Sequence, residues 1–204
     1  MKYALVNGKI LDGTKDMKAQ EGLCLLINGE EIEDILSIKD AEKKADFDSY
    51  EKIDLQGGYV MPGLINMHVH LAGSGKPQKK QRDNEKLVKQ IMGNPLIKKI
   101  AYKMVCGFAK DEMLSGVTTI RTVGGLGDFD TRLRDEIKAG TKPGPRILAA
   151  NQGISVPGGH MAGSVAIAAH SVEEALRYLE EIEGQKVDLI KLMITGGVLD
   201  AKEK

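Results

Sequence analysis

The sequence predicts an α/β protein in which a small antiparallel sheet domain, residues 1–57, precedes a region of parallel strands and helices, residues 58–204. Three observations predict this organisation. Asn-Gly pairs separate short strand-like segments before Gly57. After Gly57, apolar runs of strand length alternate with helical stretches, which is typical of a parallel sheet covered by helices. Glycine supplies 24 of the 204 residues, about 12% against an ordinary usage of roughly 7%, and this excess indicates many tight turns.

Four short strands are expected in the first region, and they cover residues 3–6, 9–11, 23–27 and 31–35. Asn7-Gly8 follows the first strand and Asn28-Gly29 follows the third, and each pair is a strong signal for a β-hairpin. The fourth segment alternates apolar and charged residues, as a half-buried strand does. Residues 39–51 are charged and weakly periodic, and we expect a loop with a helical turn there.

The second region is expected to contain four buried strands, over residues 59–69, 116–123, 146–150 and 187–194. Helices are expected between them, over residues 83–114, 128–139 and 171–183. Gly93-Asn94-Pro95 should divide the first helical region in two. Ser171 and Glu174 form a capping box at the start of the last helix. Four strand-plus-helix units fit before Lys204, whereas a closed eight-unit barrel takes about 250 residues. The sequence therefore ends where such a barrel would be half built.

The charge balance excludes two classes of partner. The chain has 29 Lys and Arg residues and 29 Asp and Glu residues, so its formal net charge is zero, and a nucleic-acid or polybasic membrane partner is not expected. No uncharged apolar run reaches the length of about 18 residues that a membrane span needs. Cys24 and Cys106 form no Cys-x-x-Cys pattern and are expected to be reduced packing residues. We therefore expect a soluble, cytoplasmic protein.

The strongest chemical feature is His68-Val69-His70, at the end of the first buried strand. Side chains alternate between the two faces of a strand, so His68 and His70 should point the same way. Two imidazoles on one face suit a divalent first-row metal. In parallel sheets, ligands collect at the carboxyl ends of the strands, which is where these histidines fall. Two hydrogen-bonded histidines on a half-buried strand are the alternative.

Lys191 is the second feature, because it lies inside the most apolar of the predicted strands. An unpaired buried ammonium is costly, so this lysine needs a carboxylate partner, a lowered pKa or a covalent modification. A neutral lysine can add carbon dioxide and become a carbamate, an anionic oxygen ligand able to bridge two cations. A lysine that extends from the strand end to solvent, or that pairs with a carboxylate, is the alternative.

Four ordered segments together resemble the amidohydrolase superfamily. Residues 57–71, which read GGYVMPGLINMHVHL, strongly resemble its first-strand signature. Further landmarks follow in order: GVTTIR at 116–121, GGH at 158–160 and IKLMITGG at 190–197. They are similar to those of the branch that contains imidazolonepropionase-related hydrolases and Xaa-Pro-type dipeptidases. The resemblance covers nearly the whole chain.

The resemblance implies a fold class for the whole chain: the first half of a metal-dependent (β/α)₈ TIM barrel preceded by a small β-sandwich domain. Residues 1–57 would be the N-terminal part of the sandwich, which both ends of a longer chain complete. Residues 58–204 would be the first four β/α units of the barrel, which needs about 250 residues when it is closed.

The resemblance also implies a site. His68 and His70 would bind the more buried of two metal ions, expected to be zinc, and Lys191, carboxylated by carbon dioxide, would bridge the two. A bridging hydroxide would attack the amide carbonyl of a dipeptide or cyclic amide. His160 would face this small-molecule substrate, or else is an ordinary exposed loop histidine. No catalytic residue is assigned within this half of the barrel.

Some residues depart from the family pattern. Asn66 and Thr122 stand where an aspartate is usual, and Met161-Ala162-Gly163 replaces a small, polar continuation. The further metal histidines and the proton-shuttling aspartate of the family come from later strands, beyond Lys204. His170 precedes a helix cap, and its expected role is structural.

Three functions are therefore open. The chain is the N-terminal fragment of a binuclear amidohydrolase, and this is the reading that we adopt. Alternatively, it is a non-catalytic truncated or split-chain half-barrel, which would associate with a second copy or with a complementary C-terminal half because its sheet edges are unpaired. The third hypothesis is a mononuclear, imidazolonepropionase-like hydrolase. Lys191 distinguishes it from the binuclear enzyme, because a mononuclear site needs no bridging lysine.

Overall fold

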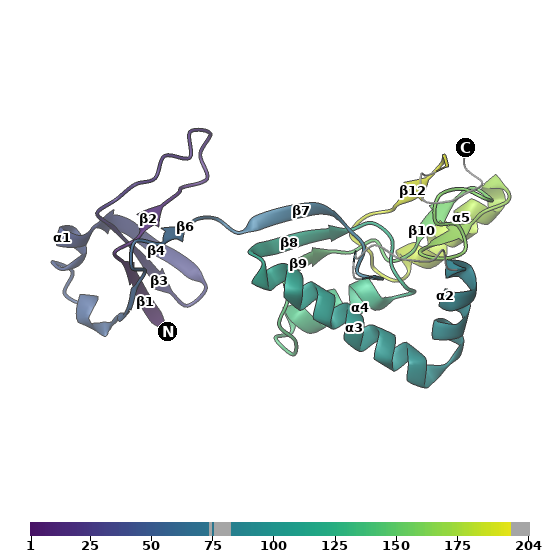
Figure 1. Cartoon of the computed structure of the whole chain (residues 1–204), viewed down its shortest axis with the longest axis horizontal. Helices are drawn as coiled ribbons and strands as arrows, with labels where there is room; N and C mark the ends of the chain where they lie inside the picture. The colour runs from purple at the N-terminus through teal and green to yellow at the C-terminus, as the bar shows by residue number, and fades with distance from the viewer. Residues whose placement is uncertain (74, 76–82, 197–204) are drawn as a thin grey trace. The chain divides into compact units, whose positions relative to one another are not determined.

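A computed structural model describes residues 1–73, 75 and 83–196, and the chain forms two compact units, of which the second begins at Gly63 (Figure 1). The elements of the first unit are β1 (Lys2–Val6), β2 (Lys9–Ile10), β3 (Leu23–Asn28), β4 (Glu31–Ser37), α1 (Ile38–Ala41), a 3₁₀ turn (Phe47–Ser49), β5 (Glu51–Asp54) and β6 (Tyr59–Val60). Four of the strands form one sheet in the order β4-β3-β1-β5, and β2 pairs separately with β6. The helical turn expected within residues 39–51 is present.

One of the two predicted hairpins is confirmed and the other is wrong. β3 and β4 pair in antiparallel fashion around Asn28-Gly29, with Asn28 opposite Glu31. No hairpin forms at Asn7-Gly8, because β1 pairs with β3 and β5 while β2 pairs in parallel with β6. The central position of β1 buries Ala4 against Cys24. This non-local packing outweighs the local preference of the turn.

The strand predicted over residues 59–69 is interrupted. Tyr59–Val60 forms β6 of the first unit, and β7 (Leu64–Val69) belongs to the second. Pro62 lies between them, and a proline has no backbone N–H to donate to a sheet. The chain therefore passes from one unit to the next after Pro62 rather than at Gly57.

The second unit alternates strands with helices, as the sequence predicts. Its remaining elements are α2 (Asn84–Gly93), α3 (Pro95–Leu114), β8 (Val117–Thr122), α4 (Phe129–Lys138), β9 (Arg146–Leu148), β10 (Gly153–Ser155), β11 (Ala166–Ala168), α5 (Val172–Glu183) and β12 (Leu192–Met193). One parallel sheet has the order β7-β8-β9 and a second has the order β11-β10-β12. The chain passes from β9 in the first sheet to β10 in the second through residues 149–152.

The helix boundaries follow from local chemistry. The Asn94 side chain accepts hydrogen bonds from the amides of Leu96 and Ile97, and Pro95 occupies the first position of α3. The Ser171 hydroxyl accepts from the Glu174 amide at 3.1 Å. The Glu174 carboxylate reaches back to the amide of His170 at 2.8 Å, which completes the predicted cap. Among the described residues, no helix is long and apolar enough to cross a membrane.

The core of the second unit lies between α3 and the β7-β8-β9 sheet (Figure 1). Tyr102, Val105 and Ala109 are spaced along one face of α3 and are buried. They pack with buried side chains of β7 to β9 and α4, including Val69, Ile120, Phe129, Leu133 and Ile147. This packing holds α3 against the β7-β8-β9 sheet.

The strand predicted over residues 187–194 is shorter than expected, because only Leu192 and Met193 form β12. Asp188 instead exchanges two hydrogen bonds with Ala149: the amide of Asp188 donates to the Ala149 carbonyl, and the Asp188 carboxylate accepts from the Ala149 amide, both at 2.8 Å. Arg134 also donates to this carboxylate at 2.8 Å. A side chain thus replaces the backbone pairing that would have extended the strand. Gly197, the last residue of the motif, lies outside the described residues.

Asp130, in the first turn of α4, is a buried carboxylic acid with little compensation. It is 1% exposed, and neither carboxylate oxygen has a hydrogen-bond partner of good geometry among the described residues. Burial raises the pKa of Asp130 to about 6, and the nearby Thr122 hydroxyl offsets this effect only in part. The charged form is therefore a source of instability in the folded chain.

We predict that Asp130→Asn stabilises the protein at neutral pH. Because the pKa rises from 3.8 to about 6 on folding, the folded state binds more protons than the unfolded state between these values, and stability falls as the pH rises through that window. The asparagine amide carries no charge and does not lose stability in this way, so the free energy of unfolding of Asp130→Asn should exceed that of the wild type by about 1–3 kcal/mol at pH 7.5. Urea unfolding at pH 4.5 and 7.5 measures the change, with the exposed Asp135→Asn as control. An equal loss of stability at both pH values would contradict the prediction.

Candidate metal and amide site

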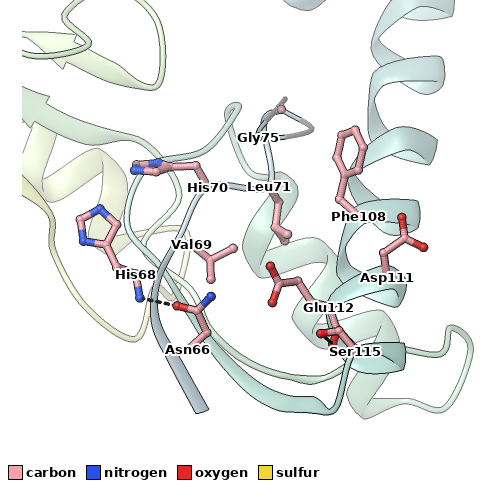
Figure 2. Close-up of a pocket in the computed structure, with 11 residues that line it drawn as sticks. Asn66, His68, Val69, His70, Leu71, Gly75, Phe108, Asp111, Glu112 and Ser115 are labelled. Carbon is pink, nitrogen blue, oxygen red and sulfur yellow. Dashed lines mark hydrogen bonds between the residues drawn. The ribbon is translucent and has the colours of Figure 1, made fainter. Parts of the chain in front are cut away.

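Two imidazoles extend from the carboxyl end of β7 to the same side of the strand. Figure 2 shows His68 and His70 on one side, while Val69 and Leu71 point the other way, toward α3. The two rings lie 5.3 Å apart between centroids, with an angle of 63° between their planes. The Asn66 side chain accepts a hydrogen bond from the His68 amide at 3.2 Å. This is the arrangement that strand alternation predicts.

The His70 ring is oriented by a backbone carbonyl. Its Nδ1 lies 3.0 Å from the carbonyl oxygen of Gly124, on the turn that follows β8. A carbonyl can only accept, so Nδ1 carries the proton, and in the neutral ring the lone pair is on Nε2. Metal-binding histidines are commonly held by such a contact on the ring nitrogen that does not bind the metal. The sequence shows Gly124 only as one of many strand-end glycines, and its role becomes visible only in the structure.

Gly124 is required at this position for two reasons. Its φ of +138° is a conformation that residues with a side chain rarely adopt. A Cβ at this position would lie 3.3 Å from His70 and 3.3 Å from Val165. A side chain at Gly124 would therefore crowd the imidazole that its carbonyl contacts.

His68 lies in a local excess of positive charge. Desolvation is the main cause that holds the pKa of His68 below the ordinary value of 6.5, and the nearby charged or titratable groups of His70, Lys191, Arg121 and His160 lower it further. Arg121, at the end of β8, donates from Nε to the carbonyl of Met67 at 2.8 Å. The His68 ring is therefore neutral at pH 7, the form in which histidine binds metals.

Lys191 immediately precedes β12, and its carbonyl accepts a hydrogen bond from the Ile154 amide at 2.9 Å. Its aliphatic stem passes over Gly153 of β10, where a Cβ would lie 3.1 Å from the Lys191 Cγ. Within the described ranges, no carboxylate forms an ion pair with this half-buried lysine. The alternative in which Lys191 pairs with a carboxylate thus finds no support there.

His160 lies on the loop after β10, beside the end of β12. The Ser155 hydroxyl donates to the His160 carbonyl at 3.2 Å, and the His160 amide lies 3.4 Å from the Thr195 carbonyl. The side chain is half-buried. The three predicted histidines therefore lie at or after the carboxyl ends of β7 and β10, whereas Lys191 lies at the amino end of β12 in the same unit.

The free edge of β7 borders a cavity of about 390 Å³. Its lining includes His68 and His70, together with Phe108, Asp111 and Glu112 of α3 (Figure 2). The acidic side chains come from the far side of the strand, and nowhere in residues 1–73, 75 and 83–196 do three or more His, Cys, Asp or Glu side chains gather as a metal site would require. The described site offers two imidazoles and one lysine.

Residues 59–202 match the Amidohydrolase family. Over 74 residues, the chain is 32% identical to a 5-methylthioadenosine/S-adenosylhomocysteine deaminase of Bacillus cereus (strain ZK / E33L), an alignment that covers 36% of this chain and 16% of that protein. The curated relative is thus matched over a small part of its length.

Solved structures match over nearly the whole chain. A putative prolidase from Bifidobacterium longum has a TM-score of 0.73 and 31% identity, covering 99% of this chain and 43% of that one. A Xaa-Pro dipeptidase with bound methionine in its active site has a TM-score of 0.71 and 29% identity, covering 98% and 48%. A prolidase complexed with N-methylphosphonate-L-proline, 23% identical with a TM-score of 0.78, shares the fold over 100% and 49%. The chain spans about half the length of each.

We predict that removing the Lys191 charge raises the pKa of His68. In Lys191→Met the ammonium no longer disfavours a second positive charge on the ring, so the midpoint of the His68 Cε1–H resonance in a pH titration followed by NMR should move upward. Lys110→Met, on α3, is the matched control and should leave the midpoint unchanged. An unchanged midpoint in Lys191→Met would show that the ammonium does not act on this imidazole.

Proposed function

Because this chain belongs to the amidohydrolase family, we propose that it carries the first metal ligands of a hydrolase that cleaves a carbon–nitrogen bond. The observation that carries the proposal is the orientation of His70, whose Nδ1 is engaged by the Gly124 carbonyl while Nε2 is available beside His68. An imidazole held in this way is prepared for a metal rather than for a second hydrogen bond. Family membership and ring geometry thus support the same function.

The residues present fit a divalent cation, most simply zinc. His68 and His70 are imidazoles on one side of β7, and Lys191 is a third group near His68 without a carboxylate partner in the described residues. Zinc accepts imidazole nitrogen and anionic oxygen ligands. When bound, a divalent cation polarises an amide carbonyl and makes water a competent nucleophile at neutral pH.

The proposed role of Lys191 is to become an anionic ligand. The ammonium would first lose one proton, and the neutral Nζ would then form a bond to the carbon of carbon dioxide and lose a second proton, which gives a carbamate and releases two protons in total. The close fit over Gly153 would hold the stem of the side chain while its end reacts. In this form, Lys191 would bridge two zinc ions and create the binuclear site. A site of the mononuclear, imidazolonepropionase-like kind would leave the lysine unmodified.

The proposed substrate is a dipeptide or a cyclic amide. The two solved structures with the higher identities are described as a putative prolidase and a Xaa-Pro dipeptidase, which supports a dipeptide. His160, half-buried on the loop beside the end of β12, is the proposed substrate contact. The deaminase relatives also act on a carbon–nitrogen bond, but they match a smaller part of the chain. Cytoplasmic activity remains part of the proposal.

We predict that zinc binding requires His70 and that peptide hydrolysis requires more than these residues. In isothermal titration calorimetry, His70→Ala should lower zinc affinity by at least about tenfold because a ligand is lost, whereas His170→Ala should bind as the parent does. Lys191→Ala tests the binuclear form: loss of one zinc equivalent supports it, and unchanged stoichiometry favours the mononuclear form.

The 204-residue chain should show negligible dipeptide turnover, and turnover at an ordinary enzyme rate would contradict this expectation.

A second candidate function, a non-catalytic half-barrel that assembles with another chain, is favoured by the sheet edges. Within the described part of the chain, β7 pairs only with β8, and β12 pairs only with β10. Ile65 on β7 is 63% exposed, and Leu192 on β12 is 59% exposed. Unpaired edges beside exposed apolar side chains promote association. The partner would be a second copy or a complementary C-terminal half.

If these edges associate, polar substitutions should dissociate the assembly. We expect the wild-type chain to elute as an oligomer in size-exclusion chromatography with light scattering, and Ile65→Lys with Leu192→Lys to shift it toward the monomer because a buried charge disfavours the contact. Leu114→Lys, at the exposed end of α3, serves as the control and should not change the mass. A well-folded wild-type monomer would rule this function out.

A further inference from the structure

We propose that Asn151 is a positioning residue for the metal site: it holds the Gly124–Gly125 turn in the place from which the Gly124 carbonyl orients His70. The proposal rests on the proposed function in one respect, since it takes His70 as the metal ligand. Asn151 lies between β9 and β10, far from His70 in sequence, and no sequence motif singles it out.

All the hydrogen-bonding groups that Asn151 presents to this region are engaged. Its backbone carbonyl accepts from the Gly125 amide at 2.8 Å. Its Oδ1 accepts from the Thr131 amide at 3.0 Å, and its Nδ2 donates to the Thr131 hydroxyl at 3.0 Å and to Gln185 Oε1 at 2.7 Å. Because a backbone amide can only donate, the atom facing Thr131 N must be the oxygen, which fixes the orientation of the side-chain amide. Asn151 is fully buried.

These contacts connect three elements at one point. Thr131 belongs to the first turn of α4, Gln185 follows α5 on the path to Lys191, and Gly125 is the second residue of the turn that faces His70. A displacement of Asn151 would therefore act both on the carbonyl that holds one proposed ligand and on the segment that leads to another. A buried side-chain amide whose hydrogen-bonding groups are all satisfied rigidifies the segments that it connects.

The Gly124–Gly125 turn is closely packed on two sides. A Cβ at Gly125 would lie 2.6 Å from the Asp130 carboxylate, and a Cβ at Gly124 would lie 3.3 Å from the His70 ring. The turn is thus packed between the first turn of α4 and the imidazole. The hydrogen bond from the Gly125 amide to the Asn151 carbonyl fixes the position of the turn between α4 and the His70 ring.

Asparagine suits this position for a conformational reason. Asn151 has a φ of +55°, in the left-handed region that asparagine and glycine tolerate better than other residues. Glycine would keep this backbone conformation but lose the three side-chain hydrogen bonds. Asn151→Gly therefore separates the backbone requirement from the positioning role of the side chain.

The test follows the tautomer of His70 in the metal-free protein by long-range ¹H–¹⁵N NMR. We expect the wild type to carry the proton on Nδ1 and Asn151→Gly to show a mixture of Nδ1–H and Nε2–H forms, with zinc affinity lowered about 10–100-fold. Leu133→Ala, a buried truncation on α4 that destabilises by about 2–5 kcal/mol, should leave the tautomer unchanged. Gln185→Ala, which removes one contact only, should give a smaller shift in the same direction and stands in if Asn151→Gly does not fold.

The possible outcomes are distinct. If folded Asn151→Gly, or Gln185→Ala in its place, keeps the Nδ1–H tautomer of the wild type, the proposal is overturned. If Leu133→Ala shifts the tautomer as much as Asn151→Gly does, general destabilisation explains the effect and the proposal is likewise overturned. If Asn151→Gly shifts the tautomer while the wild type binds no zinc, the positioning role stands and the proposed function fails.

Discussion

Parallel pairing of strands is the constraint on which the second unit depends. β8 lies between β7 and β9, with Ile120 opposite both Asn66 and Ile147, and in the second sheet β10 lies between β11 and β12. Because parallel strands all end at the same edge of a sheet, residues that are far apart in the chain meet there. Lys191 lies near enough to His68 to contribute to lowering the pKa of its imidazole. The helices α3, α4 and α5 make the crossovers that such pairing requires.

The features that could be predicted from the sequence are those governed by local chemistry. The break at Asn94-Pro95, the cap at Ser171 and the shared face of His68 and His70 each depend on a few neighbouring residues, and each is present. The hairpin at Asn7-Gly8 failed because distant strands compete for β1. The short extent of β12 likewise could not be foreseen, because the Asp188 carboxylate accepts from the amide of Ala149, which follows β9 and lies 39 positions earlier in the chain.

The candidate site likewise combines features that the sequence predicts with features that only the structure shows. Its side chains are visible in the sequence as histidines and a lysine, whereas the groups that orient them are backbone atoms. The Gly124 carbonyl and the Asn151 carbonyl carry no residue-specific signal, because every residue has one. What distinguishes them is the absence of a Cβ at Gly124 and Gly125, together with a left-handed backbone at Asn151. The proposed metal site would therefore depend on backbone placement as much as on the ligands themselves.

The pairing of β6 with β2 has a consequence for how this protein can be dissected. Val60 lies opposite Ile10, and the Leu11 amide donates to the Val60 carbonyl. A gene divided at Gly57, where the amino-acid pattern changes, would leave β2 without its partner and uncover the buried Ile10. A division after Pro62 keeps both paired strands in one piece. The two units share their boundary at a proline, and an expression boundary chosen there respects the hydrogen bonds on both sides.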